Sequence, residues 1–318
     1  MSSSTASPLY LTDEDVKKLL QWDTLIPVIE RALKTVSQTV ETPLVVQPPR
    51  TIMPVPDKNG VLLTMPGFSK NDDALACKLV TSFPDNAQKG MASIFGTVLL
   101  FDTNTGKVQA IMEANEITAW RTAAASAVAT KYLHKGSDIL AILGSGVQAR
   151  SHINALTHLL KFKEIRVWNH NQQGAEKLAA EFHELGKCIS VCYSADDAVK
   201  NADVIVTATY ASSPILKRKW IKNGVHINAV GAGINHHSEL DKELYQAASI
   251  YTDTMPAAQI ELKGLADIEV SVLGEIGEII QGTKHVPREN ITVFHSLGMA
   301  VEDVVTAKLI YEQYKMKN

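Results

Sequence analysis

The motif Gly-Ser-Gly-Val-Gln-Ala at residues 144–149 follows directly on an apolar run at 139–143. A strand that leads into such glycines and then into a helix is typical of a dinucleotide-binding turn. Gly144 permits the tight turn and Gly146 lets the backbone approach a pyrophosphate, while the N–H groups of the helix start bind phosphate oxygens. The motif therefore predicts a dinucleotide site with contacts from Gly144, Gly146, Val147 and Gln148.

A second apolar strand, expected at 165–169, ends in a polar sequence without a carboxylate. A carboxylate there accepts hydrogen bonds from the ribose 2′-hydroxyl of NAD and repels the 2′-phosphate of NADP. This chain offers the amide and imidazole groups of Asn169, His170 and Asn171 instead. We therefore expect these residues to bind the cofactor and to favour NADPH modestly, with NADH as the alternative cofactor. The simpler alternative is a polar loop after a strand.

Three basic residues stand in apolar surroundings, namely Arg50, Lys78 and Arg121. Burying any of them without an anion is costly. An arginine binds a carboxylate through two charge-assisted hydrogen bonds, and a lysine supplies a compact charge or a transferable proton. Together they would suit a small acid as a ligand, although each taken singly is more typical of a surface or ion-paired side chain.

The second half of the chain must position the glycine motif, and its pattern is one of strands that alternate with helices. Such alternation is typical of a doubly wound parallel sheet. Strands are expected at 139–143, 164–169, 189–193, 204–209, 226–230 and 250–252, with a last one at 291–294.

The first half has a different pattern of short strands separated by turns. Thr12 and Asp15 form a capping pattern at the start of a helix whose apolar positions continue to residue 33. An alanine-rich helix at 115–133 would link this half to the next, and a helix at 299–314 would return to it. Strands expected at 45–53, 61–65, 76–82 and 97–102 indicate an antiparallel module.

The 318 residues are 45% hydrophobic and 20% charged, which fits about two globular domains with an ample core. A net charge of −3, without clusters of lysine and arginine, argues against a nucleic-acid or membrane-surface role and favours small-molecule partners. No secretory signal or membrane-spanning run is recognisable, so we expect a cytoplasmic protein. Cys77, Cys188 and Cys192 are expected as buried reduced thiols, and the histidines lack the spacing of a metal site.

The chain resembles the ornithine cyclodeaminase and mu-crystallin family over nearly its whole length, and its mu-crystallin branch most. The resemblance implies a Rossmann domain, residues 123–295, inserted in an α+β substrate and dimerisation domain, residues 1–122 and 296–318. Two subunits would pair through the substrate domains. The matching segments lie at 78–81, 98–101, 117–119, 121–124, 143–149, 226–232 and 296–303.

The resemblance gives the three basic residues one common role. It implies that Arg50 and Arg121 bind a substrate carboxylate and that Lys78 is the active-site lysine. Phe83 and Gly233 are expected to contact the substrate as well. Further cofactor contacts are expected from Arg121, Thr122, Thr207, Ala208, Val230 and Ser296, with no metal ion.

Departures from the family bear on the reaction. Cyclodeaminases carry an aspartate where this chain has Gly233, and an acidic residue where it has Leu63, so cyclisation of a diamine is disfavoured. Four replacements relative to the mu-crystallin branch indicate a more apolar pocket, with ordinary core packing as the alternative. They are Phe83 for tyrosine, Ile94 and Phe95 for a His-Gln pair, and His295 for lysine.

The resemblance thus implies NADPH-dependent reduction of a small cyclic ketimine carboxylate to a saturated cyclic amino acid. A binding protein is the alternative from a different class, since mu-crystallins also bind thyroid hormone together with NADPH. Ornithine cyclodeaminase and alanine dehydrogenase activities are the alternatives within the enzyme class.

Overall fold

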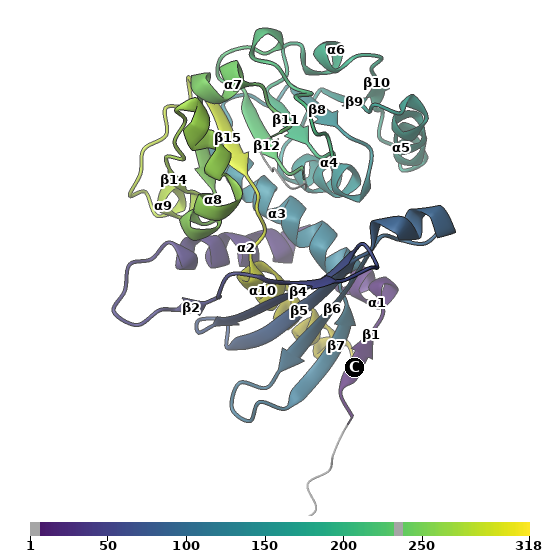
Figure 1. Cartoon of the computed structure of the whole chain (residues 1–318), viewed down its shortest axis with the longest axis vertical. Coiled ribbons are helices and arrows are strands. Elements are labelled where there is room, and N and C mark those ends of the chain that lie inside the picture. Colours follow the sequence, from purple (N-terminus) through teal and green to yellow (C-terminus); the bar gives the residue numbers. More distant parts are fainter. Residues whose placement is uncertain (1–6, 232–237) are drawn as a thin grey trace, which may run out of the picture. The chain divides into compact units, whose positions relative to one another are not determined.

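The computed structural model describes residues 7–231 and 238–318, which divide into two compact units. The first unit runs to Arg121 and resumes at Met299, and the second is Thr122–Gly298. Figure 1 traces the chain through its elements. The first boundary between the units lies one residue before the position expected from the sequence. The second boundary lies three residues after its expected position.

The sheet of the first unit is antiparallel except at one edge. Its strands are β1 (Leu9–Leu11), β2 (Val45–Val46), β3 (Thr51–Val55), β4 (Gly60–Ser69), β5 (Ala74–Ser82), β6 (Ile94–Phe101) and β7 (Val108–Glu113). Their order is β1-β7-β6-β5-β4-β2, and β3 pairs with another part of β4. β1 runs parallel to β7. The sequence patterns missed β1 and β7, and the strand expected at 45–53 is in fact two strands.

Helices α1 (Asp13–Leu19) and α2 (Trp22–Val36) replace the single helix expected near the N-terminus. Thr12 and Asp15 form the expected capping box. The expectation of one continuous helix is wrong because Leu20 and Gln21 are extended. The break lets the Trp22 ring stack on that of Trp120, with centroids 4.0 Å apart.

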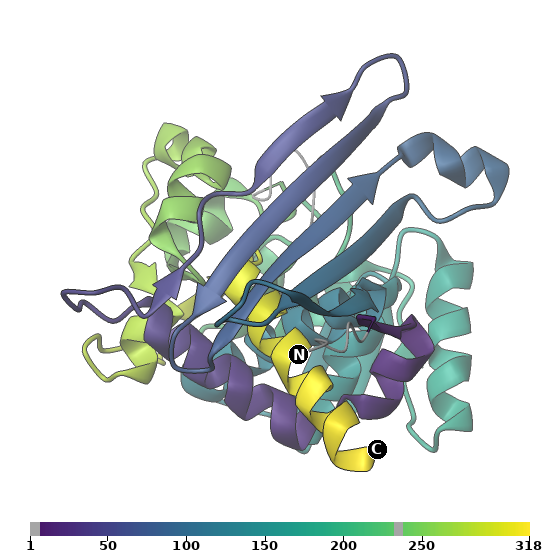
Figure 2. The same ribbon diagram turned by 90° about the horizontal axis from the view of Figure 1, so that it is seen from below.

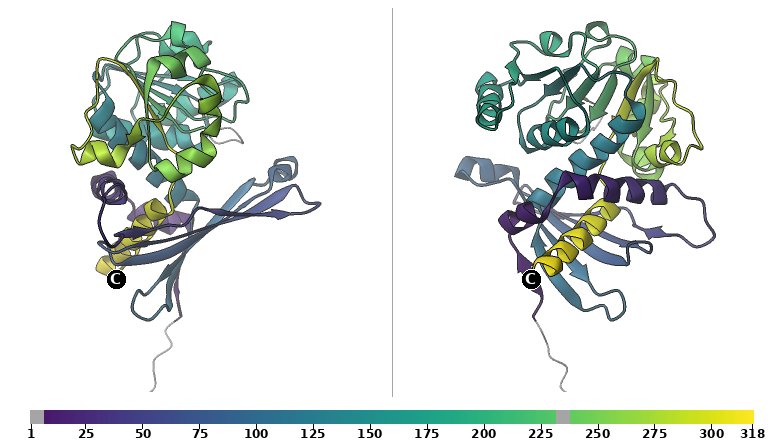
Figure 3. Two further views of the ribbon diagram at one scale, coloured as in Figure 1. Left: turned by 60° about the vertical axis from the view of Figure 1, so that its left-hand side comes forward. Right: turned by 180° about the vertical axis from the view of Figure 1, so that it is seen from behind.

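Helix α10 (Ala300–Lys317) covers one face of the first sheet. It contacts β4, β5, β6 and α2, and Figures 2 and 3 show it lying with α2 on that side of the strands. Successive residues of a strand point to opposite faces. On β5 the buried residues are accordingly Ala74, Ala76 and Lys78, whereas the alternate residues are partly exposed. A 3-10 turn, η1 (Pro84–Lys89), joins β5 to β6.

The sheet of the second unit is parallel throughout its described pairs. Its strands are β8 (Ile139–Leu143), β9 (Glu164–Trp168), β10 (Ser190–Val191), β11 (Val204–Thr207), β12 (His226–Ala229), β13 (Ala248–Thr252), β14 (Gly274–Glu275) and β15 (Ile291–His295). The order is β10-β9-β8-β11-β12-β15-β13-β14. The winding reverses between β8 and β11, which confirms the predicted doubly wound Rossmann sheet.

Helices join the strands of the second unit. They are α4 (Val147–Leu159), α5 (Gln172–Glu184), α6 (Ala195–Val199), α7 (Lys242–Ala247), α8 (Met255–Glu261) and α9 (Ile276–Ile280), with 3-10 turns η2 (Arg218–Trp220) and η3 (Lys263–Ile268). Because unit 2 lies between the two segments of unit 1 in the chain, the Rossmann sheet is inserted in the α+β part, as predicted.

Helix α3 (Asn115–Leu133) begins in the first unit and continues into the second. Within the second unit it is bonded to the sheet and to α4 by buried polar groups. Asn228 donates to the Thr130 hydroxyl at 2.9 Å, and His152 Nε2 lies 2.9 Å from the Ser126 hydroxyl. Burial lowers the pKa of His152 to about 4 and that of His226 to about 3, so both rings are neutral at neutral pH.

The cysteines are free, but the expectation that all three are buried is wrong. Cys188 is exposed because it lies in a loop. Cys77 is half-buried on the partly exposed side of β5, and Cys192 is half-buried just after the edge strand β10. Among residues 7–231 and 238–318, no group of three or more histidine, cysteine, aspartate or glutamate side chains is arranged to hold a metal ion. No helix in these same ranges is long and apolar enough to cross a membrane.

Candidate functional site

Lys78 is on the side of β5 that faces α10. Its side chain is 2% exposed, and its Nζ lies 2.7 Å from Oδ2 of Asp303. Burial lowers the pKa of Lys78 to about 8, because desolvation disfavours the ammonium more than Asp303 favours it. The lysine is therefore largely protonated at neutral pH, yet close to the point at which it gives up a proton.

Arg121 joins the same cluster from helix α3. Its Nε donates to Oδ1 of Asp303 at 3.2 Å, and its NH1 donates to Oε2 of Glu302 at 2.7 Å. Arg121 is 6% exposed, Glu302 0% and Asp303 1%. Two of the three predicted basic residues are thus brought together, and both are ion-paired inside the first unit.

The two acidic residues stand in the first turn of α10, and Gln47 fixes that turn. Gln47 Oε1 accepts a hydrogen bond from the backbone N–H of Val301 at 3.0 Å, which serves a helix start that has no side-chain cap of its own. Sequence reasoning gave Glu302 and Asp303 no chemical role. One argument could have pointed to them: Lys78 and Arg121, if buried, need carboxylates as counter-ions.

Arg50 directly precedes β3, three residues after the Gln47 anchor. The first β3 pair, Thr51 with Thr64, is adjacent in register to the pair of Met65 with Lys78. The backbone of Arg50 is therefore two strands from that of Lys78, or about 10 Å across the sheet. Arg50 is half-buried.

Phe83 lies farther from the cluster than Arg50 does. It follows β5 five positions after Lys78, which is about 16 Å along an extended chain. Its ring packs against Gly60, and a Cβ atom added to Gly60 would lie 2.4 Å from the nearest ring carbon of Phe83. Gly233, also expected at the substrate, lies outside the described residues.

The glycine turn of the second unit has the geometry that its motif predicts. Gly144 has a φ of +127°, and a side chain there would collide with the carbonyl oxygen of Ala208 at 2.4 Å. Around Gly146 a side chain would find open space, and the helix that follows, α4, lacks a side-chain cap. The first-turn N–H groups, from Val147 onward, thus receive no hydrogen bond from an N-cap side chain, and such groups at a helix start are suited to bind phosphate.

The ends of five neighbouring strands, β9, β8, β11, β12 and β15, are connected by backbone hydrogen bonds along one edge of the Rossmann sheet. Gly144 donates to Trp168, Ala208 to Leu143, Val230 to Thr207, and Ser296 to Ala229. This edge is the carboxyl end of a doubly wound sheet, where ligands of such folds bind. The predicted contacts from Thr207, Ala208, Val230 and Ser296 therefore share an edge with the glycine turn.

Two predicted cofactor contacts carry buried oxygen atoms for which the described residues provide no hydrogen-bond partner. These atoms are Oε1 of Gln148 and Oγ of Ser296. Buried polar atoms are normally satisfied, so each of these atoms is available to a partner that the described residues do not supply. Thr122, the first residue of the second unit, is buried as well. With the open glycine turn, these atoms fit a bound dinucleotide.

The residues after β9 bond to one another. Asn169 Nδ2 donates to the carbonyl of Asn171 at 2.9 Å, and the Asn171 side chain accepts from the backbone of Gln173 as the N-cap of α5. His170 is exposed. A side chain on Gly174 would meet the Ser145 hydroxyl at 2.6 Å, so α5 packs closely on the glycine turn.

Glu239 is a buried carboxyl group that sequence reasoning missed. Its Oε1 accepts from the backbone N–H and the hydroxyl of Thr209 at 2.8 and 2.6 Å, and its Oε2 accepts from the N–H of Gly231 at 3.0 Å. Burial raises the pKa of Glu239 despite these bonds. The residue ties together the chain segments that follow β11 and β12, and no local sequence pattern indicates this role.

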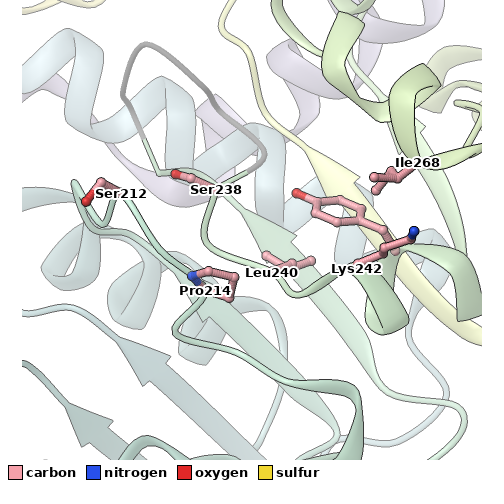
Figure 4. A pocket seen from close by; sticks show the side chains of 7 residues that line it. Ser212, Pro214, Ser238, Leu240, Lys242 and Ile268 are labelled. Carbon is pink, nitrogen blue, oxygen red and sulfur yellow. The ribbon is translucent and has the colours of Figure 1, made fainter.

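A shallow pocket of about 300 Å³ lies elsewhere in the second unit. Figure 4 shows Ser212 and Ser238 at one end and Lys242 and Ile268 at the other. The Ser238 hydroxyl donates to the carbonyl of Ala211, and the Tyr245 hydroxyl lies 3.1 Å from His295 Nε2. Among the described residues, none of the predicted site residues lines this pocket. Its lining comprises Ser212, Pro214, Ser238, Leu240, Lys242, Tyr245 and Ile268.

Comparison with known proteins gives a match over almost the whole chain. The model of the ornithine cyclodeaminase/mu-crystallin family matches residues 7–318. The ketimine reductase mu-crystallin of Rattus norvegicus is 44% identical over 313 residues, which cover 97% of this chain and 98% of the relative. A Δ1-pyrroline-2-carboxylate reductase of Bacillus cereus is 32% identical, with 96% of both chains covered.

A solved structure with the same fold carries a cofactor and a small acid. It is the Δ1-pyrroline-2-carboxylate reductase of Thermococcus litoralis in complex with NADH and L-proline, 34% identical, with a TM-score of 0.88. The match covers 97% of this chain and 98% of that one. An archaeal alanine dehydrogenase dimer with bound NAD is 31% identical, with a TM-score of 0.89 and 98% and 97% coverage.

Proposed function

Because the chain belongs to the ornithine cyclodeaminase/mu-crystallin family, we propose that it reduces small cyclic ketimine carboxylates to saturated cyclic amino acids, with NADPH as the hydride donor. The observation that carries this proposal is the buried ammonium of Lys78, whose pKa of about 8 suits a proton donor near neutral pH. Relatives named ketimine reductase and Δ1-pyrroline-2-carboxylate reductase support the same reaction class.

In the proposed reaction the basic residues divide two tasks. Arg50 and Arg121 bind the substrate carboxylate, and Lys78 donates a proton to the imine nitrogen, directly or through a water molecule. Two of the five N–H donors of Arg121 already bind Asp303 and Glu302, which fixes the plane of its guanidinium. The dinucleotide, when bound, supplies the hydride.

NADPH is proposed rather than NADH because of Asn169. A carboxylate at this position would repel the 2′-phosphate of NADPH, whereas the uncharged amide of Asn169 does not. The related solved structures contain NADH and NAD. They therefore support a nicotinamide dinucleotide as cofactor without favouring NADPH over NADH. The contacts are proposed to come from the glycine turn, the segment 169–171, and the strand-end residues Thr207, Ala208, Val230 and Ser296.

The test mixes the purified protein and NADPH with five- and six-membered cyclic ketimine carboxylates and a sulfur-containing analogue, at mildly acidic and neutral pH. We expect consumption of NADPH and formation of the saturated amino acid. Consumption at the background rate with every ketimine would reject the proposal. Cyclodeamination would give no net cofactor oxidation, and alanine dehydrogenase activity would require pyruvate and ammonia.

The role of Lys78 is tested by Lys78→Met. Loss of a general acid lowers turnover by about 100- to 10,000-fold. NADPH binding, measured by fluorescence titration, should be unchanged, and urea unfolding checks that the first unit, which contains Lys78, is still folded. Lys70→Met is the matched control, because Lys70 is exposed in the same unit. Full turnover in Lys78→Met would remove the proposed role.

The second candidate is an NADPH-dependent thyroid-hormone-binding protein. Ile94 and Phe95, which are 43% and 49% exposed, offer apolar surface for aromatic rings, and the same arginines would bind the amino-acid carboxylate. Competition distinguishes the cases. A hormone analogue that binds tightly without slowing ketimine reduction would contradict a shared site.

We propose, further, that the protein is a homodimer through its first unit. The face of the first sheet opposite α10 carries partly exposed apolar side chains that a partner would cover. Sedimentation should give twice the mass of the chain, and the mass of one chain would contradict the dimer. The residues of this face are Leu62, Pro66, Phe68, Leu75, Leu79, Leu99 and Phe101.

A further inference from the structure

Lys78, Arg121, Glu302 and Asp303 form a buried set of two cations and two carboxylates in the first unit. Asp303 is central, because its Oδ2 lies 2.7 Å from Lys78 Nζ while its Oδ1 accepts from Arg121 Nε at 3.2 Å. Glu302 binds the other side of Arg121 at 2.7 Å. When all four groups are ionised, the set has no net charge.

The charges that act on Lys78 come from two helices. Asp303 and Glu302 of α10 raise its pKa, and Arg121 of α3 lowers it. The strands on either side, β4 and β6, contain no charged residue. The Asp303 carboxylate is therefore the main group that opposes desolvation of the ammonium.

Reduction of an imine poses an electrostatic problem in such a site. The carbon of a C=N bond accepts hydride readily when its nitrogen is protonated, but a cation beside two other cations is disfavoured. A set whose charges already cancel removes this difficulty. When the proton passes from Lys78 to the imine, the positive charge changes place and the total charge of site and substrate remains constant.

We propose that Asp303, assisted by Glu302, is a positioning residue that holds the Lys78 ammonium for proton donation and stabilises the iminium that results. In the step, the Nζ–H bond breaks and an N–H bond forms at the imine nitrogen. Hydride then adds to the iminium carbon, and the π electron pair of C=N passes to the nitrogen. The neutral Lys78 amine recovers a proton from water. This inference rests on the proposed reductase function.

The test compares the pH dependence of kcat/KM for a ketimine carboxylate in the wild-type protein and in Asp303→Asn. The alkaline limb, expected near pH 8, should move to lower pH by about 1 to 3 units in the variant, because an opposite charge in contact raises a lysine pKa by that amount. Asp303→Glu and Glu312→Gln, the latter at a half-exposed residue of the same helix, should keep the wild-type limb. An unmoved limb in active Asp303→Asn overturns the inference.

Should Asp303→Asn fail to fold, Glu302→Gln replaces it. That variant leaves the ion pair of Lys78 with Asp303 in place, so a smaller move in the same direction is expected, and no move contradicts the inference. NADPH affinity should change little in each variant, because the contacts proposed from the glycine turn, the segment 169–171 and the strand ends all lie in the second unit. A purely structural role would lower stability without moving the limb.

A readout without substrate separates this inference from the proposed function. The Nζ resonance of Lys78, in protein labelled with ¹⁵N-lysine and assigned with Lys78→Arg, reports its pKa directly. A pKa that falls in Asp303→Asn while no ketimine is reduced would support the charge coupling and reject the reductase function. An unchanged pKa in a protein that does reduce ketimines would overturn the inference and leave the function standing.

Discussion

The backbone N–H of Gly231 donates a 3.0 Å hydrogen bond to Oε2 of Glu239, and the carboxyl group lies where a side chain at residue 231 would begin. A Cβ atom there would come within 2.2 Å of the carboxyl carbon. The carboxyl group cannot easily move aside, because two further hydrogen bonds hold it to Thr209.

Gly231→Ala is therefore expected to destabilise the protein by about 1 to 3 kcal/mol, the usual cost of inserting a methyl group into a packed site. Urea unfolding measures the change. Gly146→Ala is the matched control, since its Cβ would meet no atom within 4 Å. The control should change stability by less than about 0.5 kcal/mol. Equal destabilisation of both variants would contradict the role of the contact.

Arg50→Met is expected to raise KM for a cyclic ketimine carboxylate by about 10- to 100-fold, because a hydrogen-bonded charge pair is lost. The same substitution should leave the kinetics of the corresponding cyclic imine without a carboxyl group unchanged. Arg31→Met, at an arginine paired with Asp72 on the exposed surface, serves as the control. Equal losses with both substrates would show that Arg50 does not recognise the carboxylate.

Asn169→Asp is expected to shift the cofactor preference toward NADH. A carboxylate at this position accepts from the 2′-hydroxyl and repels the 2′-phosphate, so the ratio of NADPH to NADH affinity should fall by about tenfold or more. Equilibrium titration with each cofactor measures this ratio. If the ratio stays constant, the 2′-phosphate does not approach residue 169.

Stability should decrease with acid in part through the buried histidines. His226 has a pKa of about 3 in the folded state and a usual value of 6.5, so the unfolded state binds more protons between these limits. Its contribution is complete above pH 6.5 and is lost below it at about 1.4 kcal/mol per pH unit. In His226→Gln the unfolding free energy should fall less steeply between pH 6.5 and 4. Parallel curves for the two proteins would contradict a neutral buried ring.

The Rossmann half could be predicted well from sequence because its signals are local. The glycine motif at 144–149 predicts a tight turn that favours glycine, and Gly144 adopts a positive φ there. The strand ends that follow the motif are set by apolar runs and turns. The same locality explains the confirmed capping box of Thr12 and Asp15.

What sequence reasoning missed depends on contacts between distant segments. β7 mixes polar and apolar residues and is held by its pairing with β6 and β1. Glu302 and Asp303 look like an ordinary acidic first turn of a helix, and only the fold brings them to Lys78 and Arg121. Glu239 likewise acquires its partners through the two strands that it connects.

The partners of Lys78 and Arg121 belong to a helix that follows the whole inserted Rossmann segment. A ribosome must therefore synthesise nearly the full polypeptide before these cations can be neutralised. A product that stops short of residue 299 would have to bury two uncompensated charges, which is strongly unfavourable. Chains that end before Glu302 and Asp303 are accordingly expected to have a first unit that stays unfolded and open to proteolysis.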